Sequence, residues 1–359
     1  MKKRKIVVSD LHLGKGRIFE GQLNYKEDFI YDEDFYEFLR WWVRDSQSSG
    51  AESELVLNGD ILDVIKSTHR DGKVYKKDVF DFLSACIENH KIFFDALRDF
   101  TYEGGKIIWT IGNHDHPIAS PDMQNYLLEK TSINFRFVKK EYFDNGIWIE
   151  HGNRYEAINR TDLVNIWLKD GKGEEFLNMP WGTKFVVEVI DSFSFTKPYL
   201  DRWRPLGKAI KWGLIFETKI SLLALFKVIK FVLKNRKFYD PVRRRSFYVP
   251  LNLVMEAMGH KIVDRSARIL LRRQDVKVVV MGHTHRGIIA RYKDKIYANS
   301  GTWVPFVSFD TPQIGLIEKK NFVVIDIQPQ FSSPFVGVYS WYGRGRIFEE
   351  IKELNISEG

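Results

Sequence analysis

The sequence has too little cysteine for an internal disulfide bond, and we expect it to have no export signal. Its 359 residues include a single cysteine, Cys86, so no disulfide can form within the chain and a reducing compartment is the expected location. The start MKKRKIVVSD is basic, but its apolar run lasts only three residues before Ser9, which is too short for the hydrophobic region of a signal peptide. We therefore expect a cytoplasmic protein that is not exported by that route.

The sequence also has no uninterrupted apolar run of membrane-spanning length. The segment Lys211–Lys234 (KWGLIFETKISLLALFKVIKFVLK) approaches a membrane span in length and hydrophobicity. It contains, however, Glu217, Lys219, Lys227 and Lys230, and each charge costs roughly 2.5–3.5 kcal/mol near the centre of a bilayer. We therefore expect that this segment does not cross a membrane.

Apolar residues make up 44% of the chain, enough for a core, and the length fits one large α/β domain that carries an insertion. Helices are predicted over Asp32–Arg44 and Lys77–Phe100, and five apolar runs are predicted to be strands that each end in a polar or glycine-containing cluster. These strands are Lys5–Val8, Glu54–Asn58, Lys106–Ile111, Ile147–Glu150 and Val276–Met281. Ligands of open α/β sheets bind beyond the carboxyl ends of the strands, so we expect the five clusters to meet at one rim. Lys295–Ile327 is strand-rich and suggests a second layer of sheet.

The side chains at these strand ends form a set of metal ligands. They are Asp10, His12, Asp60, Asn113, His114, His151, His283 and His285. Carboxylates, imidazoles and an amide oxygen suit manganese, iron or zinc, and a thiolate is absent from the set. Side chains two apart in an extended strand end point the same way, so Asp10/His12 and His283/His285 would each present a pair of ligands, with Gly282 allowing close approach of the backbone.

Eight such groups exceed what one catalytic ion takes from a protein. Two divalent ions roughly 3.5–4 Å apart, bridged by a carboxylate, would use them. Asp60 is the expected bridge, because no histidine stands beside it at its strand end. A lone histidine at a strand end is usually a surface or hydrogen-bonded residue, but six of the nine histidines of this chain fall in these clusters.

The motifs SDLHLG, GDILD, GNHDH, HGN and GHTH, in that order between Asp10 and His285, resemble those of the calcineurin-like metallophosphoesterase superfamily. The resemblance implies a four-layer α/β/β/α sandwich with a dinuclear metal centre, manganese being the first choice and iron or zinc the alternatives. It implies that one metal is held by Asp10, His12 and His285, that the other is held by Asn113, His151 and His283, and that Asp60 bridges them. His114 would be the non-ligand histidine that protonates the leaving oxygen or stabilises phosphoryl charge. Asp115 would orient His114, and Asp63 would lie behind the ligands.

Three further features near these motifs have a structural and a functional interpretation. His116 is expected to fix its own loop, the alternative being a contact with substrate. Arg286 is expected to take a structural role, the alternative being a contact with a phosphate. Asn299–Trp303 (NSGTW) is similar to a turn common after the last histidine pair in the superfamily, and we expect it to shape the loop under the metals.

Some 130 residues separate His151 from His283, far more than a connection within a compact domain needs. We expect a core of residues 1–156 and 262–330, a helical basic cap over 157–261, and a C-terminal extension over 331–359. Residues 196–245 contain eight lysines and six arginines against three acidic residues, a net charge of +11, whereas the whole chain carries +8. The basicity therefore belongs to the cap.

The cap segment Lys211–Lys234 predicts a helix with a wide apolar face and a lysine stripe, because Lys219, Lys227, Lys230 and Lys234 fall within an arc of roughly 80°. Such a helix is typical of a membrane interface, and the aromatic and arginine-rich flanks suit anionic headgroups. The alternatives are packing inside the protein or at a dimer interface, and nucleic-acid binding. The last is disfavoured, because nucleic-acid sites use aromatic stacking and little aliphatic surface.

Among superfamily branches, SDLHLG, the helical insertion before GHTHR and the basic cap are similar to the UDP-2,3-diacylglucosamine pyrophosphohydrolases of lipid A biosynthesis. Those are peripheral membrane enzymes, so the resemblance implies hydrolysis of a phosphodiester or pyrophosphate in a lipid-linked substrate at the inner face of the membrane. The chain has GNHD and HGN where that branch has GNRD and HGD. The alternatives are a metal-dependent nuclease, a soluble phosphodiesterase or phosphatase of the same superfamily, and a non-catalytic scaffold, which would typically have lost ligands that this chain retains.

Overall fold

The computed structural model describes residues 2–343, except 68, 194–195, 198–199, 205, 242, 249–260 and 311–312, together with 349–350 and 354–355. A seven-stranded sheet has the strand order β23-β22-β21-β1-β4-β7-β8. Its strands are β1 (Lys3–Val8), β4 (Glu52–Asn58), β7 (Lys106–Thr110), β8 (Phe135–Val138), β21 (Asn321–Ile327), β22 (Phe335–Ser340) and β23 (Glu349–Glu350). Strands β1, β4, β7 and β8 run parallel, and β21 pairs antiparallel with β1.

A six-stranded sheet has the order β24-β17-β18-β16-β10-β9. Its strands are β9 (Tyr142–Asp144), β10 (Ile147–Ile149), β16 (Val278–Met281), β17 (Gly287–Tyr292), β18 (Lys295–Ser300) and β24 (Leu354–Asn355). Strands β10, β16 and β18 are parallel neighbours. The strand-rich segment Lys295–Ile327 is therefore divided, since β18 lies in this sheet and β21 in the other.

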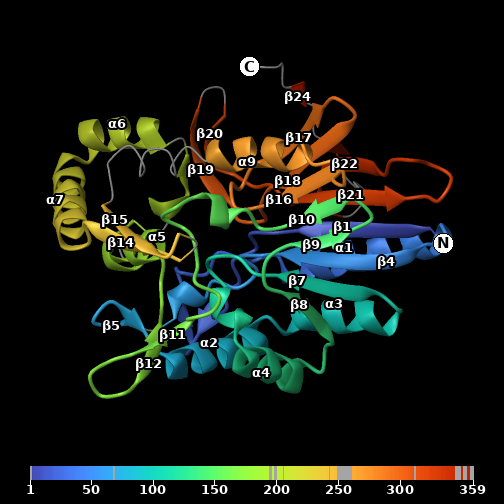
Figure 1. Ribbon diagram of the computed structural model, residues 1–359. Helices are drawn as coiled ribbons and strands as arrows, with labels where there is room; N and C mark the ends of the chain where they lie inside the picture. The colour runs from blue at the N-terminus through green and yellow to red at the C-terminus, as the bar shows by residue number, and fades with distance from the viewer. Residues whose placement is uncertain are drawn as a thin grey trace.

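The two sheets pack face to face, and helices cover their outer faces (Figure 1). The helices are α1 (Asp32–Ser48), α2 (Lys76–Asn89), α3 (Lys91–Tyr102) and α4 (Pro121–Thr131) on the larger sheet, and α9 (Lys261–Leu271) on the smaller. Strand β1 shows why its run is continuously apolar: Val7 packs between the sheets, whereas Ile6 and Val8 face the helices. The predicted four-layer α/β/β/α sandwich is confirmed.

The helix predicted over Lys77–Phe100 is two helices, α2 and α3, separated at His90. The His90 side chain is buried, and its Nδ1 lies 2.9 Å from a carboxylate oxygen of Asp32 at the start of α1. Burial lowers the pKa of His90, but its bonds to Asp32 and Glu27 outweigh burial and raise it to about 9. A helix with uninterrupted apolar periodicity is thus broken by a buried ion pair that periodicity does not reveal.

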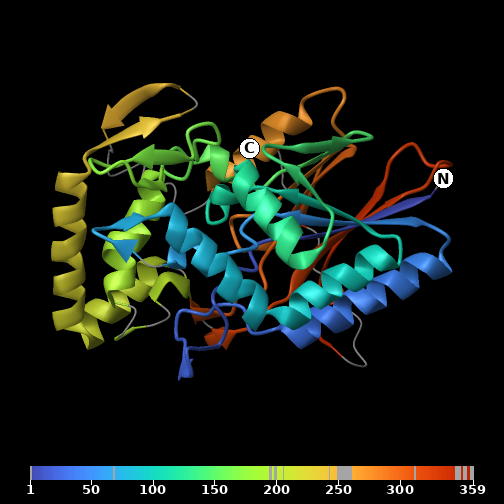
Figure 2. The same cartoon turned by 90° about the horizontal axis from the view of Figure 1, so that it is seen from below.

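The described residues between β10 and α9 form a separate group of elements at one end of the sandwich (Figures 1 and 2). They are β11 (Trp167–Lys169), β12 (Glu175–Leu177), α5 (Trp181–Phe185), a π-helix (Val186–Ile190), β13 (Trp203–Arg204), α6 (Leu206–Phe216), α7 (Thr218–Lys234), β14 (Lys237–Asp240) and β15 (Arg245–Tyr248). Strand β13 pairs with β19 (Phe306–Asp310), which pairs with β20 (Gln313–Ile317). Strand β22 lies beyond residue 330, where the core was expected to end, and its pairing with β21 makes it part of the larger sheet.

Candidate metal centre

The expected ligands lie in loops that follow strands of two different sheets. The sequence had predicted that they meet at one rim of a single sheet. The loops after β1, β4 and β7 belong to the larger sheet, and the loops after β10 and β16 belong to the smaller. The loop after β1 runs beside the loop after β4, because the backbone nitrogens of Asp10 and His12 donate to the carbonyl oxygens of Gly59 and Asp60, at 3.1 and 3.0 Å. The ligands therefore meet where the two sheets face each other at their carboxyl ends.

The backbone at five of these ligands is left-handed. The φ angles are 53° at Asp10, 55° at His12, 51° at Asp60, 68° at His283 and 56° at His285. The prediction that the Asp10/His12 and His283/His285 pairs project from extended strand ends is therefore wrong, and strands β1 and β16 stop at Val8 and Met281. A non-glycine residue in this region costs on the order of 1–3 kcal/mol and persists where its surroundings enforce it, as at functional sites.

One group of ligand atoms is formed by Asp10, His12 and His285, which lie within 4.8 Å of one another. The Nε2 atoms of His12 and His285 face each other at 3.3 Å, and Nε2 of His285 lies 3.2 Å from Oδ1 of Asp10. The other oxygen of Asp10 is used within the protein, because Ser9 Oγ and the backbone nitrogen of His283 donate to it. The ring nitrogens and Oδ1 thus converge on one point, as ligands of a cation do.

A second group is formed by Asp60, His151 and His283. Nε2 of His151 lies 3.0 Å from Oδ2 of Asp60, and its Nδ1 donates to the carbonyl oxygen of Asn58 at 2.9 Å. That bond keeps a proton on Nδ1, so Nε2 is the nitrogen that faces Asp60 and that a bound ion would use. Asn113, the fourth expected ligand here, is buried beside the same loops.

Several atoms of the two groups have no hydrogen-bond partner among the described residues, although they are buried. They are Oδ1 of Asp10, Oδ1 of Asn113 and Nε2 of His151. Buried polar atoms are almost always satisfied, so these atoms fit metal ions, which supply positive charge where hydrogen bonds are missing. When bound, divalent ions at such a site neutralise phosphoryl oxygens and lower the pKa of a coordinated water.

The carboxylates of the centre are ionised at neutral pH. Burial raises the pKa of Asp10, but His285 and His151 outweigh burial and lower it to about 2. Burial also raises the pKa of Asp60, but His151 and His114 outweigh burial and hold that pKa well below its usual value. Negative charge fixed in a buried pocket favours the binding of cations.

His114 lies at the opening of the centre with 21% of its side chain exposed. Its Nδ1 is 2.9 Å from Oδ1 of Asp63, and its backbone nitrogen donates to Oδ1 of Asp60 at 2.8 Å. Burial lowers the pKa of His114, but Asp60 and Asp63 outweigh burial and raise it to about 9. A protonated imidazole held in this way can donate its Nε2 proton to a leaving oxygen.

Asp115 does not orient His114, and that expectation is corrected. Its carboxylate accepts from the backbone nitrogens of Ile61 and Gly112, at 3.0 and 2.8 Å, and from Nε1 of Trp109 at 3.2 Å. Asp115 thus ties the loop after β7 to the loop after β4, and Asp63 orients His114. Asp115 is next to His114 in sequence and Asp63 is 51 positions away, so only the contacts show which carboxylate orients the histidine.

Two glycines of the motifs are required by close packing against ligands. A Cβ atom on Gly112 would lie 2.1 Å from Oδ1 of Asp60, and one on Gly282 would lie 2.5 Å from Oγ of Ser9 and 2.7 Å from Oδ2 of Asp10. The expectation that Gly282 allows close approach of the backbone is confirmed.

The three features with two interpretations make contacts within the protein, and a phosphate contact of Arg286 stays a prediction. His116 is fully buried, and its Nδ1 bonds to the carbonyl oxygen of Asn113 at 2.9 Å, so it fixes the loop that carries a ligand. Arg286 donates to Asp264 at 2.8 Å. Within Asn299–Trp303, Oγ1 of Thr302 donates to the carbonyl oxygen of Asp10 at 2.7 Å, which supports the loop under the centre.

Sequence reasoning missed Glu156. This buried carboxylate lies 2.9 Å from Nε2 of His283, and Asn159 donates to the same oxygen at 2.7 Å. A carboxylate on Nε2 leaves Nδ1 of His283 as the nitrogen available to the centre. The only sequence signal was an acidic residue five positions after His151, and the 3-10 turn Asn153–Tyr155 that brings it back is not readable from a motif.

Replacing Glu156 with alanine is expected to weaken metal binding by ~10–100-fold, because the partner of a ligand histidine is lost. Glu156→Gln should give a smaller loss, since its amide oxygen still accepts from Nε2. Chelator competition with manganese and zinc would measure both. The control is Glu141→Gln, at a surface carboxylate that pairs with Arg154. Equal metal affinity in Glu156→Ala and the wild type would contradict the assignment.

Comparison with protein families matches residues 3–287 to calcineurin-like phosphoesterases. No curated protein matches the chain. Among solved structures, it is similar to an uncharacterised protein described as a predicted phosphoesterase from Streptococcus pneumoniae TIGR4 (10% identity, 98% of each chain, TM-score 0.32). It is also similar to vacuolar protein sorting 29 from Cryptosporidium parvum (11% identity, 98% of this chain and 99% of that one, TM-score 0.34), and to an archaeal phosphodiesterase (11% identity, 93% and 99%, TM-score 0.29). Likenesses this distant carry no argument about the activity.

Proposed function

Because the chain belongs to the calcineurin-like phosphoesterase family, and is therefore a metal-dependent phosphoester hydrolase, we propose that it acts on a lipid-linked substrate at a membrane surface. The scissile bond is a phosphodiester or a pyrophosphate, as in the UDP-2,3-diacylglucosamine hydrolases that its motifs resemble. The proposal includes two divalent ions, with manganese as the first choice. The observation that carries it is the exposed apolar surface of α6 and α7.

We call this surface the outer apolar face. Its members are exposed residues of α6 and α7: Ile210, Trp212, Leu214, Ile215, Phe216, Leu222, Leu223, Leu225, Phe226, Ile229 and Leu233. The exposed fraction reaches 70% at Ile215, 64% at Phe226 and 68% at Leu233. Many exposed apolar side chains gathered on two neighbouring helices mark a site of interaction with a membrane or a protein.

In the described part of the chain, the side of α7 opposite the outer apolar face is the only side of this helix that packs inside the protein. There Phe231 is buried against Trp181 and Phe185, with ring centroids 5.1 and 5.4 Å apart, and Ala224 and Val228 pack on the same cluster. The helix is therefore apolar on two sides, of which the protein itself covers one.

Positive charge lies beside the outer apolar face. Lys208, Lys211, Lys219 and Lys230 are exposed on α6 and α7, where lysine side chains can reach anionic headgroups while apolar neighbours enter the interface. In the part of the chain that the structure describes, no helix is both long enough and apolar enough to cross a bilayer. Apolar insertion combined with basic charge supports a helix that lies in the membrane surface.

Substituting Phe226, Ile229 and Leu233 together with serine is expected to lower partitioning onto vesicles of anionic phospholipid by about 100-fold. Full burial of each side chain is worth roughly 1.5–3 kcal/mol, and insertion into the interface recovers part of it. Vesicle co-sedimentation measures partitioning, and hydrolysis of soluble bis(4-nitrophenyl) phosphate reports whether the centre is intact.

The matched control substitutes three exposed apolar residues outside the cap, Tyr102, Leu128 and Ile269, with serine. Equal partitioning of the two triple variants would contradict membrane association. A different outcome is that the wild type is a dimer that does not bind vesicles, and that the cap substitutions convert it to a monomer. The outer apolar face would then be a dimer interface. DNA binding that weakens steeply with salt would favour the nuclease alternative.

A further inference from the structure

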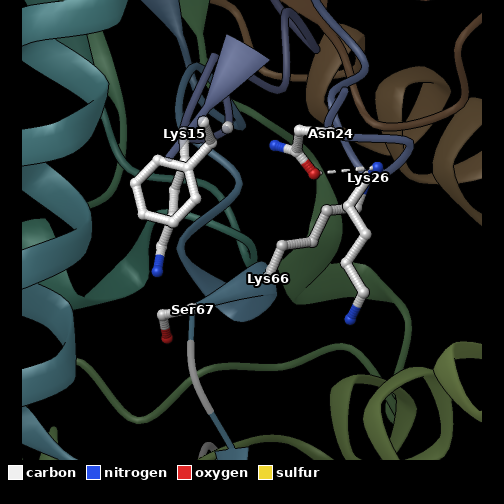
Figure 3. A pocket seen from close by; sticks show the side chains of 7 residues that line it. Lys15, Asn24, Lys26, Lys66 and Ser67 are labelled. Carbon is white, nitrogen blue, oxygen red and sulfur yellow. Dashed lines mark hydrogen bonds between the residues drawn. The ribbon is translucent and has the colours of Figure 1, made fainter. Parts of the chain in front are cut away.

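A cavity of about 370 Å³ opens beside the metal centre and is lined by Gly14, Lys15, Phe19, Asn24, Lys26, Lys66 and Ser67. Figure 3 shows the three lysines around it, with Asn24 hydrogen-bonded to the backbone of Lys26. Every charged residue in this lining is a lysine. We call it the lysine cavity.

The loop that carries Lys15 is fixed by a buried carboxylate. Glu27 accepts from the backbone nitrogens of Gly14 and Gly16 at 2.9 and 2.6 Å, and it lies 3.4 Å from Nε2 of His90. A Cβ atom on Gly14 would lie 2.6 Å from Glu27, so the backbone is in direct contact with this support. The position of Lys15 is therefore set by the fold.

The lysine cavity adjoins the side of the centre where His114 lies. Gly14 comes two residues after the expected ligand His12. Nζ of Lys66 is 3.0 Å from Oδ2 of Asp63, whose other oxygen binds His114. Because His114 is the residue assigned to protonate the leaving oxygen, we place the cavity on the leaving-group side.

The three lysines differ in how far their charge is balanced. Lys66 contacts both Asp63 and Asp28, and Lys26 lies 3.2 Å from Asp191. Lys15 instead lies over the ring of Phe19, with Nζ 4.8 Å from the centroid. A cation over an aromatic face keeps its positive charge available to an anion.

We propose that the lysine cavity binds a second anionic group of the substrate, carried on the leaving-group side of the scissile phosphorus, with Lys15 as its main contact and Lys26 as a second. The inference rests on the proposed function and restricts its substrates to those with such a group. That group is either a phosphate bridged directly to the scissile phosphorus or a separate anion on the leaving alcohol, and both offer oxygens that ammonium groups bind.

The test uses competitive inhibition of bis(4-nitrophenyl) phosphate hydrolysis by three probes: inorganic phosphate, inorganic pyrophosphate and 3-phosphoglycerate. Lys15→Gln is expected to raise the inhibition constant of pyrophosphate or 3-phosphoglycerate by ~10-fold, at least five times more than it changes that of phosphate, because a charge-assisted bond is lost only to the probes with a second anion. Pyrophosphate sensitivity identifies a bridged phosphate, and 3-phosphoglycerate sensitivity identifies a separate anion.

The matched control is Lys130→Gln, which removes a lysine that also lies over an aromatic ring, 5.6 Å from the centroid of Tyr126, outside this lining. Lys15→Arg should keep most of the inhibition, because a cation remains. Equal changes for all three probes, or none in Lys15→Gln, would overturn the inference. A metal-loaded wild type that fails to hydrolyse the diester would instead overturn the proposed activity.

Discussion

Replacing His114 with asparagine is expected to lower kcat by ~10²–10⁴-fold, the usual contribution of a positioned general acid, while the bound metal stays unchanged. The bond to Asp63 and the raised pKa hold His114 protonated at neutral pH. Activity of the wild type should fall as the pH rises through the pKa of His114. That pKa is about 9 in the protein alone and lower beside divalent cations. The variant should lack this alkaline decline.

Metal content separates this role from that of a ligand. His12, Asp63 and His114 do lie close enough together to hold an ion, but Nζ of Lys66 already contacts Asp63 at 3.0 Å and neutralises it. Elemental analysis of purified His114→Asn should therefore equal the wild type, with Lys130→Gln as a control for handling. Loss of metal from His114→Asn would make His114 a ligand, and wild-type turnover would refute its role as an acid.

The ligands could be read from the sequence because strand ends are chemically simple: an apolar run stops, a glycine allows close packing, and polar side chains follow. Asp10, Asp60, His151 and His285 were found in this way, and the structure brings them together. The conformation of these loops could not be read, because residues with left-handed φ angles such as Asp10 and His12 are held by hydrogen bonds to another segment. Local periodicity carries no information about such contacts.

Residues that support the ligands were harder to find for the same reason. Glu156 contacts His283 across 127 positions of sequence, and His90 interrupts a helix to reach Asp32. Asp115 adjoins His114 in sequence, but tertiary contacts give it to the loops and give Asp63 to the histidine. The exposure of Phe226 is also a tertiary property, since the sequence of α7 fits a helix packed inside the protein equally well.

Replacing Asp60 with asparagine is expected to lower kcat/KM by about 10³-fold or more, because an ionised ligand is replaced by a neutral one of the same shape and several kcal/mol of charge stabilisation are lost. The amide oxygen can still accept from the backbone nitrogen of His114, so the loop should stay folded. If Asp60 bridges two ions, elemental analysis should find at most one ion per chain in the variant and two in the wild type.

The test of Asp60 depends on separating the charge from the fold. Asp275→Asn is the matched control, because its carboxylate pairs with Arg273 at the surface, and it should keep full metal and activity. Dialysis against a chelator should abolish wild-type hydrolysis, and manganese should restore it to the wild type but only weakly to Asp60→Asn. Full metal occupancy in Asp60→Asn would contradict a bridging carboxylate, since His151, 3.0 Å away, would then bind its ion without it. If Asp60→Asn keeps one ion and loses turnover, hydrolysis requires the negative charge of the Asp60 carboxylate between the two groups of ligands.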